Sequence, residues 1–112
     1  MDDIQHEWLM DVFDAVQDFT SDTMGFVTTL HMDRMEITIH GDHIDPVMFS
    51  IRIDFDGDYP SFRMMMWIDD DLSIGDPMQY SDDLDPDPHD AANELCEMIG
   101  KMYNRYYYRR SR

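Results

Sequence analysis

The sequence predicts one α+β domain, residues 1–112, with an N-terminal helix, a four- to five-stranded antiparallel meander and a C-terminal helix. Three observations predict it. Apolar and polar residues alternate between Val47 and Ile68, apolar residues recur every three or four positions near both ends, and the connections between most predicted strands are short. The length of 112 residues is enough to bury a modest core without disulfides.

The stretch 47–68 is the predicted centre of the sheet. Its period of two is typical of strands with one buried face, and Asp56-Gly57 suits a tight hairpin turn between them. The apolar positions are Val47, Phe49, Ile51, Ile53 and Phe55 on the first strand and Phe62, Met64, Met66 and Ile68 on the second.

Residues 2–19 are predicted to form an amphipathic helix, because apolar residues from Ile4 to Phe19 recur at helical spacing. Its other side carries acids at steps of four, four, three and four, which places them in one row about 5–6 Å apart along the axis. No lysine or arginine interrupts this row, called the acidic stripe below. It consists of Asp3, Glu7, Asp11, Asp14 and Asp18.

Two short strands, 26–32 and 35–40, are expected before the central hairpin. They are joined at Asp33-Arg34 and preceded by a linker over 20–25, and a polar connection over 41–46 follows them. The stretch 69–87 contains eight aspartates and no base, and its prolines disfavour a long regular element. We expect an Asp-rich loop there, pinned by a few apolar side chains and containing at most a short strand.

The last helix is predicted to begin with Asp87 as its N-cap and Pro88 at the first helical position. Its end, residues 105–112, is a short tail with four of the eight bases. Because the rest of the chain is acidic, this tail is expected to pack on the acidic body or on a second copy, which leaves a homodimer open.

The formal net charge is −17, from 25 acids against 8 bases, and 21 of the acids are aspartate. Such a field disfavours direct binding to nucleic acid or to an anionic membrane and favours basic protein surfaces. The chain has one cysteine, no apolar run of about 20 residues and no basic segment at its N-terminus. These features predict a cytoplasmic protein.

Several residues invite a chemical interpretation that their spacing does not support. Asp54, Asp56 and Asp58 lack the glycine and glutamate positions of a calcium loop. The possible metal ligands His40, Asp42, His43 and Asp45 match no zinc or iron spacing. Cys96 falls on an apolar helix face, where cysteine acts as a small hydrophobe. The sequence therefore predicts no catalytic residue, no metal and no cofactor, and indicates a protein that is not an enzyme.

Met48, Met65 and Trp67 share the second face of the central hairpin with Arg63. Methionine and tryptophan are common at adaptable binding surfaces. Either a helix covers this face or a partner does. In the second case the chain is an acidic chaperone or a toxin-immunity protein that binds through the face.

Our leading hypothesis from the sequence is mimicry of nucleic-acid charge. Fixed, regularly spaced carboxylates suit a cleft in which lysine and arginine normally contact phosphates. Adaptation to high salt is the competing explanation for the same acidity, and it predicts a fold that needs molar salt. The residues expected to bind a basic nucleic-acid-binding protein are Asp3, Glu7, Asp11, Asp14, Asp18, Asp69, Asp70, Asp71, Asp82, Asp83, Asp85 and Asp87.

In composition the chain resembles small acidic phage inhibitors of restriction, CRISPR or DNA-repair proteins. That resemblance implies an anti-restriction or anti-CRISPR protein acting in the host cytoplasm. The helix–strands–helix order with an acidic first helix is also similar to frataxin. Class I secretion chaperones are likewise acidic α+β proteins, but they carry a helix between strands that this sequence lacks.

Overall fold

The computed structural model describes residues 3–41, 47–68 and 78–110, with side chains at all of these except 67–68, 78 and 106–110. The elements are α1 (Asp3–Phe19), η1 (Thr20–Met24), β1 (Val27–His31), η2 (Met32–Arg34), β2 (Glu36–His40), β3 (Val47–Asp54), β4 (Ser61–Ile68), β5 (Met78–Asp83) and α2 (Pro88–Arg110).

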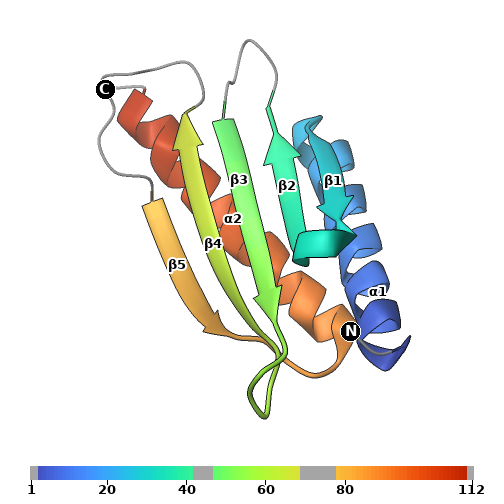
Figure 1. Cartoon of the computed structure of the whole chain (residues 1–112). Coiled ribbons are helices and arrows are strands. Elements are labelled where there is room, and N and C mark those ends of the chain that lie inside the picture. Colours follow the sequence, from blue (N-terminus) through green and yellow to red (C-terminus); the bar gives the residue numbers. More distant parts are fainter. Residues whose placement is uncertain (1–2, 42–46, 69–77, 111–112) are drawn as a thin grey trace.

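The five strands form one antiparallel sheet in the order β1-β2-β3-β4-β5, and both helices lie on the same face of it (Figure 1). The predicted α+β fold, with a meander between two helices, is therefore confirmed. The other face, called the open face below, has no α-helix over it among the described residues, and the short 3-10 helix η2 lies at its β1–β2 end.

The core lies between the sheet and the two helices. Alternate side chains of β3, such as Phe49 and Ile51, are fully buried, and they meet Leu9 of α1 and Leu95 of α2 in one apolar cluster. Each such side chain contributes about 1.5–3 kcal/mol relative to an exposed one. The alternation seen in the sequence thus gives the correct buried face.

The hairpin between β3 and β4 differs from the expected tight turn. Pairing ends at Asp54 opposite Ser61, so the connection spans six residues, 55–60. Pro60 has no N–H to extend the ladder, and the Asp54 carboxylate instead accepts a hydrogen bond from the Asp56 amide at 2.8 Å. Phe55 turns toward α1, where its ring meets that of Trp8.

One further segment differs from its prediction, and the predicted Asp-rich loop contains the short strand that the prediction allowed. Residues 20–24, expected as a linker, continue α1 as a π-helical turn, because the buried Thr20 hydroxyl bonds the Val16 carbonyl at 3.0 Å and also meets the Thr28 hydroxyl. Gly25, at φ 70°, ends that turn. Within the predicted loop 69–87, residues 78–83 form the edge strand β5, while 69–77 lie outside the described residues.

The start of α2 agrees with its prediction. The Asp87 carboxylate accepts a hydrogen bond from the His89 amide at 2.8 Å, and Pro88 is the first helical residue. Across the described residues, no helix has the length and apolar character that crossing a membrane requires.

Replacing Gly25 or Gly100 with alanine is expected to change the free energy of unfolding in opposite directions. Gly25→Ala places a side chain at φ 70° and should lower the free energy of unfolding by about 1 kcal/mol. Gly100→Ala lies inside α2 with nothing within 4 Å of the new Cβ, and should raise it by about 0.5–1 kcal/mol. Urea denaturation of both variants measures this, and a neutral Gly25→Ala would contradict the left-handed cap.

Candidate interaction surface

All five residues of the acidic stripe are exposed on α1. The opposite side of the helix is buried through Trp8, Leu9, Val12 and Val16, so the apolar contacts determine which way the stripe faces. The α1 sequence contains no lysine or arginine. The five predicted residues of the acidic stripe therefore lie together on one solvent-facing surface.

Several contacts hold α1 in place. The indole Nε1 of Trp8 donates a hydrogen bond to the Pro86 carbonyl at 2.8 Å, and its ring packs edge-on against Phe55 with centroids 5.3 Å apart. At the other end, Thr20 binds both the helix and β1 through its hydroxyl. A stripe fixed at both ends presents its carboxylates at constant positions, which a basic cleft requires.

The second predicted group of acids has a partly structural role. Asp82, Asp83 and Asp87 are exposed and Asp85 is half-buried. The carboxylates of Asp82, Asp85 and Asp87 each accept a backbone N–H at 2.8–2.9 Å, and they thereby shape the turn from β5 into α2. Asp69, Asp70 and Asp71 lie outside the described residues.

The two groups do not form the two parallel rows that the sequence suggested. The stripe follows α1, which contacts β1 and α2, whereas β5 is the opposite edge of the sheet (Figure 1). They approach each other only at one end of the molecule, where Trp8 reaches Pro86. The stripe and the second group are therefore two surfaces that share one end.

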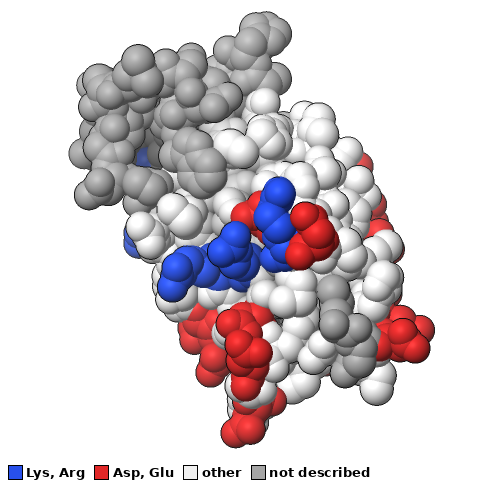
Figure 2. Space-filling model, viewed as in Figure 1, with Lys and Arg blue, Asp and Glu red and all other residues white. Residues whose placement is uncertain are grey.

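That shared end carries acids that sequence reasoning left out of the surface. The connection between β3 and β4 lies there, because the Leu84 amide donates to the Pro60 carbonyl at 2.6 Å. Figure 2 shows red side chains gathered at this end. The additional acids are Asp54, Asp56, Asp58 and Asp90, all exposed. In the sequence, these aspartates indicate a turn and the start of a helix, and both are present. The sequence does not show that the turn and the helix start lie at the same end of the molecule.

Among the described side chains, little of this charge is neutralised by a base. The ion pair there is Arg34 with Glu36, at 3.2 Å between Nη2 and Oε1. Arg52, Arg63, Lys101 and Arg105 make no ion pair with a described acid. The acids therefore attract mobile cations or a basic partner rather than internal bases.

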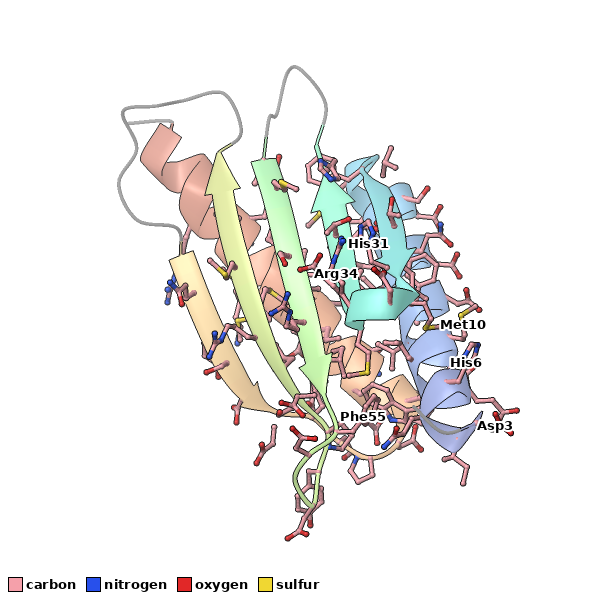
Figure 3. All side chains as sticks on the ribbon, in the orientation of Figure 1. Asp3, His6, Met10, His31, Arg34 and Phe55 are labelled. Atoms are coloured by element: carbon pink, nitrogen blue, oxygen red, sulfur yellow. The ribbon has the colours of Figure 1, made fainter. Side chains whose placement is uncertain are left out.

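The open face has a different chemistry. Cross-strand pairing places Arg52 directly opposite Arg63, and both are exposed. Arg34 of η2, labelled in Figure 3, lines a hollow of about 940 Å³ together with these two arginines. Met48 and Met65 are half-buried on the same face, and Trp67 pairs with Met48 in the backbone register. The face expected from Met48, Met65 and Trp67 exists, but its centre is basic and polar.

The described residues do not form a metal site or a reactive cysteine site. In 3–41, 47–68 and 78–110, no three histidine, cysteine or acidic side chains converge in a way that would hold a metal ion. Asp42, His43 and Asp45 lie outside those ranges. Burial raises the pKa of the Cys96 thiol from 9.0 to about 11, so its nucleophilic thiolate is scarce at neutral pH.

Comparison with known proteins gives no further assignment. No protein-family model, curated protein or solved structure matches the chain.

The raised pKa of Cys96 predicts a sluggish thiol. A difference of about two pKa units makes the thiolate about a hundredfold scarcer than in a free cysteine at the same pH below 9. Alkylation by iodoacetamide should therefore be slow in the native chain and fast in urea. Reaction of the native thiol at the free-cysteine rate would contradict the buried position.

Proposed function

We propose that this chain is an inhibitor that occupies the nucleic-acid-binding cleft of a basic protein, with the acidic stripe of α1 in the place of phosphates. The observation that carries the proposal is the stripe itself: five exposed carboxylates in one row, on an anchored helix without a base. In the cleft, carboxylates would meet the lysine and arginine side chains that normally bind phosphate.

The stripe carries less charge per unit length than the nucleic acid that it would replace. One charge per about 5–6 Å of helix axis is sparser than one strand of DNA, which carries a charge every ~3.4 Å of its axis. The inhibitor therefore offers fewer contacts than the nucleic acid, but they are already fixed in place. Carboxylates on a folded protein are also not a substrate for a nuclease.

The stripe is unfavourable for the helix that carries it, and this supports a role outside folding. Its neighbours at i,i+3 and i,i+4 are like charges, each pair costing about 0.2–0.5 kcal/mol in an isolated helix. Natural sequences retain such costs where function requires them. A surface that only needed solubility would intersperse both signs.

The biological setting belongs to the same proposal. A host nuclease or other nucleic-acid-binding defence protein is the class of target that an acidic phage protein would inhibit, in the host cytoplasm. Restriction enzymes and CRISPR effectors hold nucleic acid in positively charged channels, so either class offers a suitable cleft.

The alternative function uses the open face, and one observation favours it: α1 and α2 both lie on the other side of the sheet, so no described α-helix covers this face. An acidic chaperone or immunity protein would bind its partner there. The two functions differ in salt dependence, because carboxylate–arginine contacts weaken with ionic strength while apolar contacts do so only slightly.

The decisive test compares two variants with the same change in charge. Glu7→Gln, Asp11→Asn and Asp14→Asn neutralise three acids of the stripe, while Asp33→Asn, Glu94→Gln and Glu97→Gln neutralise three exposed acids outside the candidate surface. A protein captured by the wild-type chain from nuclease-treated bacterial lysate is purified, and its release of a labelled DNA duplex is titrated with each chain. The stripe variant should need about tenfold more protein or more, which corresponds to about 1.4 kcal/mol of lost contact energy.

The control variant should displace DNA like the wild type. Both variants should remain folded by circular dichroism, and the stripe variant should be the more stable in low salt, because like-charge pairs have been removed. Equal displacement by the two variants, or capture of a partner that does not bind nucleic acid, would contradict the proposal. A chain that folds only in molar salt would instead favour salt adaptation.

A further inference from the structure

The open face carries two adjacent rows of side chains, of which the first holds two arginines and the second two aspartates. Strand register places Glu36, Arg52 and Arg63 in one row across β2, β3 and β4. Two residues further along the strands, about 7 Å away, Asp54 and Asp83 flank Ser61 in a second row across β3, β4 and β5. Figure 2 shows the resulting blue band beside the red end of the molecule.

The basic row is unfavourable in the isolated chain. Like charges directly opposite each other on antiparallel strands destabilise the pair, and neither Arg52 nor Arg63 has an ion pair with a described acid. Three of the chain's eight bases gather here, in a protein that has 25 acids. A contact that brings carboxylates over this row would remove the repulsion.

A second copy of the chain supplies those carboxylates in the right place. Consider a two-fold axis that is parallel to the two rows, runs midway between them and lies between the two facing copies. Rotation about this axis reverses positions along the strands. It leaves positions across the sheet, from one strand to the next, unchanged. It therefore puts Arg52 over Asp54 of the second copy, because both belong to β3. Arg63 falls over Ser61 of the second copy, between its Asp54 and Asp83, about 5 Å to either side.

We propose that the chain forms a two-fold symmetric dimer through its open face, in which the row of Arg52 and Arg63 in each copy pairs with the Asp54 and Asp83 row of the other. The contact is isologous, so every ion pair occurs twice. Packed sheet faces lie about 10 Å apart, which long arginine side chains can bridge.

The size of the face fits a weak dimer. The five strands are five to eight residues long and lie about 4.8 Å apart, so the face covers about 500 Å² per copy, or ~1,000 Å² in total, which is close to the smallest area of a specific interface. The hairpin 55–60 adds Tyr59, whose side chain is 55% exposed. At physiological ionic strength, repulsion between the two net charges is screened beyond about 8 Å, whereas contact pairs are screened less.

The dimer leaves α1 free. Both helices lie on the face away from the proposed contact (Figure 1), so each copy would display its acidic stripe to solvent. The dimer is therefore compatible with the proposed inhibitor but does not depend on it.

Charge exchange tests the geometry. Arg52→Asp alone gives acids at both positions and Asp54→Arg alone gives bases at both, so each single variant should be monomeric. Their equimolar mixture should form a heterodimer. The double variant Arg52→Asp/Asp54→Arg restores opposite signs and should form a homodimer again. Sedimentation equilibrium from micromolar to sub-millimolar protein measures all four samples and the wild type.

Arg105→Asp is the matched control, because it changes the net charge as Arg52→Asp does at an exposed position on α2, away from the open face. It should leave the dimer within about twofold of wild-type affinity, while Arg52→Asp should weaken it about tenfold or more. Circular dichroism checks that each variant is folded. A wild-type chain that stays monomeric throughout, or a mixture of single variants that does not associate, would overturn the proposal.

Discussion

The indole of Trp8 makes the contact on which the acidic surface depends. Its N–H donates to the Pro86 carbonyl and its ring packs on Phe55, so one side chain joins α1, the β3–β4 connection and the start of α2. These segments are far apart in sequence, and each brings its own aspartates. The concentration of charge at one end of the molecule is thus a consequence of apolar packing rather than of attraction between the charged groups.

The apolar cluster has to offset the repulsion that this arrangement creates. Twenty core side chains are buried between the sheet and the helices, and burial of this kind is the main favourable term in folding. With a single ion pair among the described residues, the charges contribute little to holding the chain together. The apolar core on one face of the sheet therefore stabilises the fold, and the charged side chains lie on the surfaces that face solvent.

Much of the fold follows from local patterns. Period-two alternation gave β3, β4 and their buried face, and Asp87-Pro88 gave the start of α2. The position of β5 was not predictable in the same way, since an exposed edge strand with polar side chains resembles a loop. Which face of the sheet each helix covers was also undetermined, because amphipathicity identifies the buried side of a helix but not the surface that it meets.

The arginine pair shows how a short connection decides a surface. A two-residue turn at Asp56-Gly57 would have placed Arg52 opposite Ser61 and Arg63 opposite Ser50. The six-residue connection shifts the register by two, which preserves the buried face but sets Arg52 opposite Arg63. The stripe on α1 was predictable because helical geometry alone defines it, whereas the open face depends on turn length and pairing.

The central claim is that the stripe on α1 is the surface that a basic target covers. Carbodiimide labelling of carboxylates, read by mass spectrometry on the free chain and on its complex with the captured target, tests it most directly. The account predicts that Glu7, Asp11, Asp14 and Asp18 are labelled in the free chain and protected in the complex, while Asp33 and Glu97, exposed away from α1, stay labelled in both. Protection that spares α1 and falls on the open face would contradict it.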